Sequence, residues 1–335
     1  MMKLGLIIGR FDPPHQGHSV VLDVALGHVE RLLVFVRQCE GESVPAALRI
    51  TWLQEIYPQV DFMLVVDDPA IKPDDLEAQA RRAHGYLGEL VPDVLFSSEA
   101  YDPIIARMLG AKSYSVDRDC HWVPINSTMV RRNPLDYLQY LAPVVRAHYV
   151  KRVCVVGSES TGKTTLCKKL AATFDTNWVS EYGRDYSLVK RSRGDLGRWT
   201  TDEFFHIGRE QRRWEDEAAR RANKVLFCDT DEFATEIWLE LYMSKKPESW
   251  PLPPSKIDLY LLPYPDVPFV SDGIRDAEHR RFWMFERFQE ELTKRGRPFI
   301  ILEGEFEERE AQAGTAVERL LASAGAAAPN DQGAR

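Results

Sequence analysis

The chain has 335 residues, more than one average domain requires, so two domains are the first expectation. Asp and Glu outnumber Lys and Arg by 51 to 43, and the formal net charge of −8 argues against a dedicated nucleic-acid-binding protein, which needs a basic surface. No apolar run approaches the ~18 residues of a membrane span, and the five scattered cysteines contain no C-x-x-C pair. We therefore expect a cytoplasmic protein with reduced cysteines and no membrane insertion.

The first part of the chain alternates short apolar strands with helices, beginning with a strand, a glycine-containing loop and a helix. The expected strands cover residues 3–8, 31–37, 61–68 and 93–98, and the expected helices 46–57, 74–89 and 102–110. β-Branched apolar runs that alternate with helices are typical of parallel α/β sheets with buried strands. The pattern predicts a Rossmann-like, doubly wound sheet over residues 1–145.

The second part of the chain repeats the order of strand, glycine-containing loop and helix from residue 151. The expected strands cover residues 151–157, 177–180, 225–229, 259–263 and 298–304, and the expected helices 201–222, 232–243 and 277–296. This predicts a second parallel α/β domain over residues 150–322. The proline-rich stretch 245–255 reads as a surface loop, and the small, polar residues 323–335 predict a disordered tail.

The mid-chain loop "GSESTGKT", residues 157–164, matches the phosphate-loop pattern G-x-x-x-x-G-K-[ST] between a predicted strand and a predicted helix. In that context the glycines let backbone N–H groups surround a phosphate, Lys163 supplies a positive charge, and the Thr164 hydroxyl is offered to Mg²⁺. The residues expected to bind the nucleotide are Gly157, Ser160, Gly162, Lys163, Thr164 and Thr165. The loop predicts a P-loop nucleotide site of the kinase type.

Three acidic residues of the second part follow predicted strands. Asp229 ends the strand "VLFCD" and Asp231 follows it, where a carboxylate that binds Mg²⁺ is expected, although Asp231 is at least as well placed to cap the next helix. Glu181 ends the strand after the phosphate-loop helix and is placed to orient or deprotonate a sugar hydroxyl. Arg184, one turn later, fits a phosphate contact and a surface charge equally well. We expect Asp229 to join Thr164 at the Mg²⁺.

The segment "FVSDGIRDAEHRR", residues 269–281, places three arginines after a glycine. It resembles a mobile lid whose arginine closes on the triphosphate during transfer. Of Arg275, Arg280 and Arg281, we expect only Arg275 to play this part, since a solvated helix start explains the other two.

The loop "GRFDPPHQGH", residues 9–18, carries His15 and His18 three positions apart. A metal pair on a helix prefers four-residue spacing and needs a third ligand, so a metal is the weaker interpretation. A capping or core histidine without a chemical role stays open. The third interpretation is a nucleotide site, in which Gly9 and Gly17 let the chain approach a ligand and both imidazoles face phosphate oxygens at a helix N-terminus.

This loop resembles the G-x-F-x-P-x-H-x-G-H signature of the nucleotidyltransferase superfamily, which transfers adenylyl or cytidylyl groups. The matching residues are Gly9, Phe11, Pro13, His15, Gly17 and His18. The superfamily's second signature resembles "INSTMVR", with Asn126 where serine is more usual. Ser127 and Thr128 are expected to cap a helix and bind phosphate, and Arg131 to add positive charge at the triphosphate.

The two signatures in this order resemble the bifunctional NadR family over roughly residues 3–305, including "SEYGRDY", "FCDTDEFAT" and "DLYLLPYPDVPFVSDGIR". The resemblance implies two ATP- and Mg²⁺-dependent activities, a ribosylnicotinamide kinase and a nicotinamide mononucleotide adenylyltransferase that forms NAD. Some members begin with a helix-turn-helix repressor domain, for which the sequence shows no segment before the first strand. Phe269 stands where the family pattern has tryptophan, so it is expected either to stack on the pyridinium ring or to pack.

Other functions remain open at this point. The adenylyltransferase could act on another phosphate acceptor, such as phosphopantetheine or a flavin precursor, and the kinase on a different nucleoside. A nucleotide-sensing regulator with little turnover is a candidate from another class. The expected partners are small molecules and further copies of the chain in a homo-oligomer, not nucleic acid.

Overall fold

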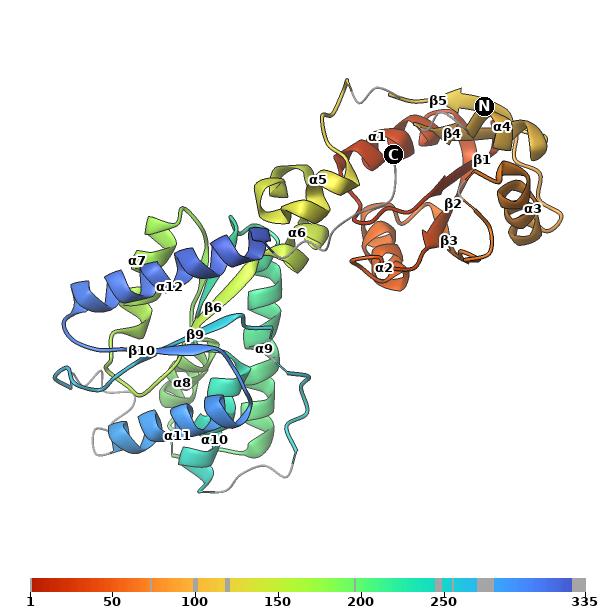
Figure 1. Ribbon diagram of the computed structural model, residues 1–335. Helices are drawn as coiled ribbons and strands as arrows, with labels where there is room; N and C mark the ends of the chain where they lie inside the picture. Colours follow the sequence, from red (N-terminus) through yellow and green to blue (C-terminus); the bar gives the residue numbers. More distant parts are fainter. Residues whose placement is uncertain are drawn as a thin grey trace. The chain divides into compact units, whose positions relative to one another are not determined.

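Two parallel sheets organise the chain in the computed structural model (Figure 1). The structure describes residues 2–72, 74–98, 102–117, 121–195, 197–244, 249–254, 256–269 and 280–326. They divide into two compact units, Met1–Val145 and Arg146–Ala327. Among the described residues, every helix is too short or too polar to cross a bilayer.

The first unit contains a five-stranded sheet of order β3-β2-β1-β4-β5, with all neighbouring strands parallel. Its strands are β1 Met2–Gly9, β2 Val29–Gln38, β3 Asp61–Val66, β4 Val94–Ser97 and β5 Lys112–Ser115. Its helices are α1 Gln16–Leu26, α2 Ala46–Ile56, α3 Leu76–Leu87, α4 Asp102–Met108 and α5 Ser127–Arg132, followed by two short 3₁₀ turns, Pro134–Asp136 and Leu138–Tyr140. Helix α6, Pro143–Tyr149, spans the division between the units.

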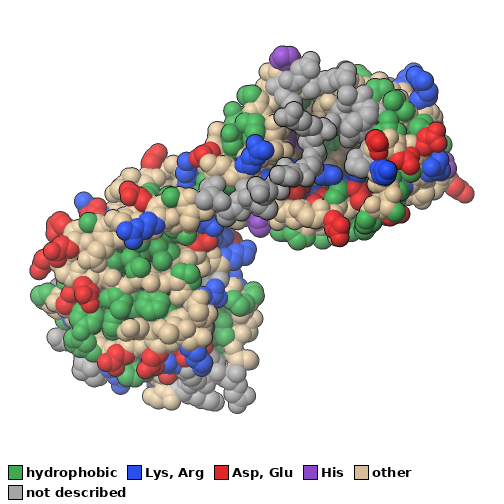
Figure 2. All heavy atoms as spheres, in the orientation of Figure 1, with side chains coloured by type: hydrophobic (Ala, Val, Ile, Leu, Met, Phe, Trp, Pro, Cys, Tyr) green, Lys and Arg blue, Asp and Glu red, His purple; other side chains and the backbone are tan. Residues whose placement is uncertain are grey.

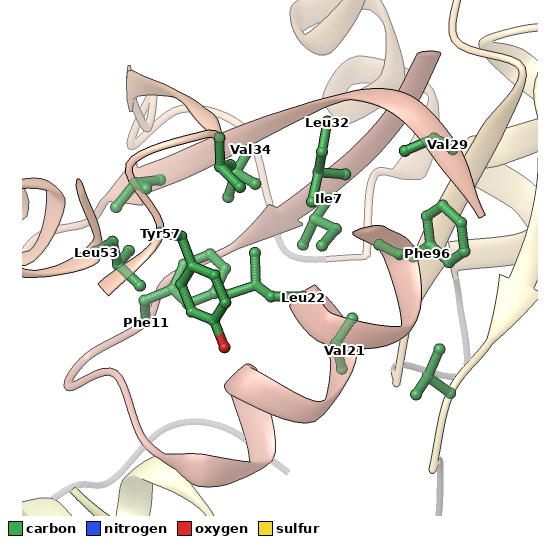
Figure 3. Packing of buried hydrophobic residues seen from close by; sticks show 14 of the residues in the cluster. Ile7, Phe11, Val21, Leu22, Val29, Leu32, Val34, Leu53, Tyr57 and Phe96 are labelled. Carbon is green, nitrogen blue, oxygen red and sulfur yellow. The ribbon is translucent and has the colours of Figure 1, made fainter. Parts of the chain in front are cut away.

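Helices cover both faces of this sheet because alternate strand residues point to opposite sides. On β2, Leu32 and Val34 pack with residues of α1 and α2, whereas Leu33 and Phe35 pack with α3 and α4. Figure 3 shows the first of these clusters, in which Phe11 from the loop after β1 is buried. The loop that carries both histidines is therefore anchored in the core by its own aromatic residue.

The expected strands and helices of this unit are confirmed to within a few residues, but β5 was not predicted, and α5 was expected only as a helix start at the second signature, without bounds. Strand β5 is exposed at all four positions at the edge of the sheet, so it lacks the apolar run by which the other strands were found. Helix α5 has only six residues, too few for a helical period to show.

The second unit contains a five-stranded parallel sheet of order β10-β9-β6-β8-β7. Its strands are β6 Lys151–Val155, β7 Trp178–Val179, β8 Val225–Asp229, β9 Leu259–Pro263 and β10 Phe299–Leu302. Its helices are α7 Lys163–Thr173, α8 Tyr182–Ser192, α9 Thr201–Ala219, α10 Glu232–Met243, α11 Arg281–Lys294 and α12 Phe306–Ala326. Helices α7 and α12 pack on one face, where Leu170 and Val317 meet Val155 and Phe227.

The end of this unit differs from the sequence-based expectation. Helix α12 runs to Ala326, past residue 323 where the disordered tail was expected to begin, because buried Ala313 and Val317 hold its apolar side against the sheet. Residues 327–335 lie outside the described residues. Helix α8 and helix α12 were not expected as elements, whereas the strands of the second sheet were.

Candidate active sites

The histidine-containing loop lies at the point where the first sheet reverses its strand order. The chain runs outward from β1 through β2 and β3 and then returns to place β4 on the other side of β1. In open parallel sheets, ligands bind beyond the carboxyl ends of the strands at this switch point. The loop from Arg10 to His15 leaves the carboxyl end of β1 there and leads into α1.

His15 and His18 are held together by backbone hydrogen bonds at the start of α1. The Gly17 N–H donates to Nδ1 of His15 over 3.1 Å, and the His15 N–H donates to Nδ1 of His18 over 3.3 Å. The ring centroids are 3.8 Å apart. A Cβ on Gly17 would come within 3.0 Å of Cε1 of His15, so the helix start requires glycine to bring the ring this close. His15 is therefore the N-cap of α1, as the capping interpretation expected, which leaves its chemical role open.

The same contacts define the protonation state of the pair. Burial, and to a lesser extent the charge of Arg131, lowers the pKa of His15 to about 4. Burial and the neighbouring His15 lower the pKa of His18 well below its usual value. A neutral imidazole whose Nδ1 accepts a hydrogen bond carries its proton on Nε2. Both side chains are thus neutral Nε2–H donors at pH 7 in the free protein. The metal interpretation lacks a third ligand, because no cluster of three His, Cys, Asp or Glu occurs among the described residues.

Arg131 connects the second signature to the first. Its Nη1 donates to the backbone oxygen of Asp12 over 2.7 Å, and its Nη2 donates to the Thr128 hydroxyl over 3.1 Å. The expectation that Ser127 and Thr128 cap α5 was wrong. Asn126 is the cap, since its Oδ1 accepts the Met129 N–H over 2.9 Å, and Ser127 is the first helical residue. Arg131 therefore brings a positive charge from α5 to the N-terminal loop.

Two buried residues that the sequence analysis did not select shape the loop. Asp12 is 3% exposed and accepts hydrogen bonds from the Ser43 hydroxyl and from the backbone N–H groups of Ser43 and Val44. Arg49 is fully buried, donates to the backbone oxygen of Arg10, and forms an ion pair with Glu42. Asp12 lies inside the signature and could have been noticed, but nothing in the sequence around Arg49 indicates its role.

The phosphate loop of the second unit connects β6 to α7. Gly157 has a φ of 140° and Gly162 a φ of 82°, conformations that side chains other than glycine rarely adopt. Lys163 is buried, and its Nζ donates to the backbone oxygen of Ser158 over 2.7 Å, so the ammonium group lies against the loop itself. Ser160 also has a positive φ, of 56°, whereas Thr165 is exposed on α7. The loop therefore adopts a curled backbone with its lysine folded over it.

Thr164 and Asp229 meet although 65 residues separate them. The Thr164 hydroxyl donates a hydrogen bond to Oδ2 of Asp229, which is 2% exposed at the end of β8. Mg²⁺ prefers hard oxygen ligands and takes only one or two from the protein when it is bound with nucleotide phosphates. This hydroxyl and carboxylate fit that requirement. Asp231, by contrast, caps α10 through the Ala234 N–H and accepts the Tyr260 hydroxyl, which favours the capping alternative.

A narrow cavity of about 20 Å³ is lined by Glu181 and by Thr230, the residue after Asp229. Its walls combine polar groups and aromatic rings, and are formed by Glu181, Gly183, Ser187, Trp199, Phe204, Ile207, Gln211, Thr230, Thr235, Trp238 and Tyr242. Trp199 and Trp238 both contact Tyr242, with ring centroids 5.5 Å and 6.0 Å apart. The sequence analysis selected only Glu181 from this set, because helices α8, α9 and α10 bring the rings together from distant positions. Arg184 is exposed on α8 and is absent from the cavity wall.

Of the lid residues, Arg275 lies outside the described residues. Arg281 is 6% exposed; its Nη2 donates to the backbone oxygen of Ser160 over 3.3 Å, and its guanidinium lies 5.8 Å from the Phe269 ring. Arg280 donates to the backbone oxygen of Leu241. The structure thus brings Arg281 to the phosphate loop and the Phe269 ring next to Arg281. Phe269 does not line the narrow cavity, whose aromatic residues come from other segments. A larger cavity of about 410 Å³, lined in part by Glu232, contains none of the residues expected from the sequence.

Comparison with known proteins agrees with this two-part geometry. Residues 6–164 match the cytidylyltransferase-like family, and residues 152–309 match an AAA domain family. The "Trifunctional NAD biosynthesis/regulator protein NadR" of Escherichia coli (strain K12) is 26% identical in an alignment 295 residues long that covers 81% of this chain and 71% of that protein. The protein of the same name from Salmonella typhimurium is 26% identical over 82% of this chain and 72% of its own length. The chain is thus similar to NadR proteins over most of its length.

Solved NadR structures share the fold of this chain. A crystal structure of NadR protein in complex with NR superposes with a TM-score of 0.75 at 21% identity and covers 96% of this chain and 97% of that chain. A second, in complex with NAD and AMP-PNP, gives a TM-score of 0.74 at 21% identity over 95% and 96% of the two chains. The expected α/β fold, with an N-terminal nucleotidyltransferase sheet and a C-terminal P-loop sheet, is confirmed.

Proposed function

We propose that the chain is a bifunctional enzyme of NAD biosynthesis. Its kinase domain, residues 150–322, phosphorylates nicotinamide riboside with ATP, and its adenylyltransferase domain, residues 1–145, converts the resulting mononucleotide and a second ATP to NAD and pyrophosphate. The observation that carries the proposal is that each of two nucleotide loops meets its partner residues from far along the chain, Arg131 at Asp12 and Asp229 at Thr164. The NadR relatives are named for NAD biosynthesis, and solved NadR structures contain NR, or NAD with AMP-PNP, which supports the proposal.

In the kinase reaction the 5′-hydroxyl of the riboside attacks the γ-phosphorus of ATP and ADP leaves. Lys163 neutralises charge on the transferring phosphoryl group once it turns from Ser158 to the phosphates. Thr164 and Asp229 hold Mg²⁺, which supplies charge neutralisation at the phosphates when bound. Because Asp229 is engaged with Thr164, we assign to Glu181 the positioning of the attacking hydroxyl and the acceptance of its proton.

The narrow cavity beside Glu181 is our candidate for the riboside pocket. Its aromatic residues Trp199, Trp238 and Tyr242 suit a positively charged pyridinium ring, because aromatic faces attract cations. At about 20 Å³ it has room for about one water molecule, so the rings must separate when the riboside enters. Phe269 lies outside its wall, and Arg184 is exposed; for both we retain only secondary substrate contacts as a proposal.

In the adenylyl transfer the mononucleotide phosphate attacks the α-phosphorus of ATP, so no protein nucleophile is needed. His15 and His18 donate from Nε2 to phosphate oxygens, and Arg131 supplies the positive charge. Ser127 and Thr128 lie in the first turn of α5, where backbone N–H groups favour phosphate. Gly9, Phe11 and Gly17 shape the loop around the ligand. Catalysis comes from alignment and from hydrogen bonds that strengthen as pyrophosphate leaves.

The proposal includes ATP as co-substrate, Mg²⁺ as cofactor, a cytoplasmic location and a homo-oligomeric assembly. It excludes nucleic acid as a partner. The formal net charge of −8 supports that exclusion, as does the interspersion of acidic and basic side chains over the described part of the face drawn in Figure 2. For the lid we propose Arg275 together with Arg281, which already contacts the phosphate loop.

The deciding experiment is incubation of the purified chain with ATP, Mg²⁺ and nicotinamide riboside, followed by identification of the products by mass spectrometry. The expected result is nicotinamide mononucleotide that is consumed as NAD and pyrophosphate form. Absence of both products would contradict the proposal and turn attention to other acceptors, such as phosphopantetheine or a flavin precursor. Nucleotide binding without any turnover would favour a sensing role.

A further inference from the structure

Gln211 on α9 bridges the two loops that carry Glu181 and Asp229. Its Oε1 accepts the backbone N–H of Tyr182, the residue after Glu181, over 2.9 Å. Its Nε2 donates to the backbone oxygen of Thr230, the residue after Asp229, over 3.3 Å. The side chain is 1% exposed, so neither hydrogen bond competes with bulk water.

Strand pairing alone does not fix the position of Glu181 relative to Asp229. Strand β7 consists only of Trp178 and Val179 and ends two residues before Glu181. Among the described residues, the Glu181 side chain makes no capping hydrogen bond to α8, and the first N–H group of the helix, that of Tyr182, has no partner within it. Gln211 on α9 supplies a hydrogen-bond acceptor for the Tyr182 N–H and thereby fixes the position of the first residue of α8.

The other end of the bridge holds an unfavourable backbone conformation. Thr230 has a φ of 68°, which a β-branched residue adopts only when its surroundings enforce it. Its N–H donates to the backbone oxygen of Val155 over 3.0 Å, and its own oxygen accepts from Gln211. The turn directly after Asp229 is therefore held on both sides.

A third contact orients the Gln211 amide. Its Nε2 also donates to Oε1 of Glu215, one turn further along α9 and 1% exposed, over 3.2 Å. With both donors directed to Thr230 and Glu215, the amide oxygen faces Tyr182, so the group cannot turn over without losing all three hydrogen bonds.

We propose that Gln211 is a positioning residue of the phosphoryl transfer, which sets the separation between the Glu181 carboxylate and the Asp229 carboxylate. The inference rests on the proposed kinase function. It assigns no contact between Gln211 and the riboside, although the side chain lines the same cavity. Loss of the bridge lets Glu181 move away from the line of attack, which lowers kcat and leaves ATP binding at the phosphate loop unchanged.

The test compares two changes at the opposite ends of one hydrogen bond. Gln211→Met removes the bridge with little change in volume. Tyr182→Pro removes only the bridging N–H when it is compared with Tyr182→Ala, because both lose the ring, and proline is tolerated at the first helical position. Glu181 already has φ −70° and ψ 106°, values compatible with a following proline. Gln289→Met on α11 makes the same glutamine change elsewhere in the unit.

The expected kcat for riboside phosphorylation falls about tenfold or more in Gln211→Met, with KM for ATP within about twofold of the parent. With Gln211 present, the kcat of Tyr182→Pro is expected to be about tenfold lower than that of Tyr182→Ala. In the Gln211→Met background the two kcat values should be equal, because the hydrogen bond between Tyr182 and Gln211 is already lost. NAD formation from the mononucleotide by the other unit stays unchanged, and the nearly unchanged KM for ATP reports that the kinase unit of each variant is folded.

Two outcomes would overturn the proposal. The first is a tenfold difference in kcat between Tyr182→Pro and Tyr182→Ala that persists in the Gln211→Met background. The second is a rise in riboside KM with kcat unchanged in Gln211→Met, which would make Gln211 a substrate contact. Hydrogen exchange at the Tyr182 amide distinguishes failure of the bridge from failure of the proposed kinase function. Faster exchange in Gln211→Met shows that the bridge exists, even if the parent protein phosphorylates no riboside. In that case the proposed function fails while the bridge itself is still measured.

Discussion

The guanidinium of Arg131 donates a 2.7 Å hydrogen bond to the backbone oxygen of Asp12, across 119 positions of the sequence. Asp12 lies between the phenylalanine and the first histidine of the N-terminal loop, so this contact joins the two signatures into one site. It also places the site's permanent positive charge beside two imidazoles that are neutral. Charge neutralisation and hydrogen-bond donation thus fall to different residues.

Arg131→Ala is expected to lower kcat/KM for NAD formation about 100-fold or more, the usual cost of losing one charged donor at a developing negative charge. The same variant should phosphorylate riboside at the parent rate. Arg132→Ala removes the exposed neighbouring charge of α5 and is the matched control. Equal losses in the two variants would show that general positive charge, not the Arg131 contact, matters.

His18→Ala and Lys163→Ala should produce opposite losses in steady-state assays of the two half-reactions. His18→Ala abolishes NAD formation from the mononucleotide and leaves riboside phosphorylation intact, because the His18 ring lies at the start of α1 in the first unit. Lys163→Ala abolishes phosphorylation and leaves adenylyl transfer intact. Loss of both activities in either well-folded variant would contradict two independent sites.

Asp229→Asn is expected to raise the Mg²⁺ concentration needed for half-maximal riboside phosphorylation about tenfold and to lower kcat. The reason is that the carboxylate next to the Thr164 hydroxyl loses its charge while its shape is kept. Titration of the initial rate with Mg²⁺ measures the shift. Asp258→Asn, at the partly buried ion pair with Lys151, changes a carboxylate of the same unit and should leave the Mg²⁺ dependence unaltered.

Stability of the first unit should decrease as the pH falls from about 6.5 toward 4. The pKa of His15 is about 4 in the folded chain, against 6.5 for an unperturbed histidine, so in this window the unfolded chain binds a proton that the folded chain does not. The full difference corresponds to about 3 kcal/mol. His15→Asn keeps a capping side chain and should lose less unfolding free energy between pH 7 and pH 4.5.

Urea unfolding of the first unit, followed by hydrogen exchange in β1, measures that difference. The exposed His84 on α3 provides the control, because His84→Asn should leave the pH dependence as it is in the parent. A parent protein that is equally stable at both pH values would contradict the buried neutral imidazole.

Tyr242→Ala should raise KM for nicotinamide riboside about tenfold, the amount that ~1.4 kcal/mol of aromatic contact with a cation contributes. KM for ATP should not change. Trp283→Ala on α11 is the control, because Trp283 and Tyr242 are each 40% exposed but only Tyr242 lines the cavity. An unchanged riboside KM in Tyr242→Ala would move the pyridinium ring to another pocket.

Much of the fold was predictable because its strands are buried on both faces. The apolar runs of β1, β2, β8 and β9 stand out from their surroundings, and each was placed within two or three residues. The two-residue β7 lies within the expected strand 177–180, whereas the edge strand β5, exposed at all four positions, gave no such signal and was missed.

The sequence by itself determined where the two phosphate-binding loops begin and which chemistry they support, because close backbone approach to phosphate demands glycines, a lysine and a hydroxyl at fixed spacing. Only the tertiary structure decided which distant groups complete them. Arg131 reaches Asp12, Asp229 reaches Thr164, and Gln211 bridges two loops because parallel strands deliver their carboxyl ends to one edge of a sheet. The neutral state of His15 was likewise a matter of burial, which no local pattern encodes.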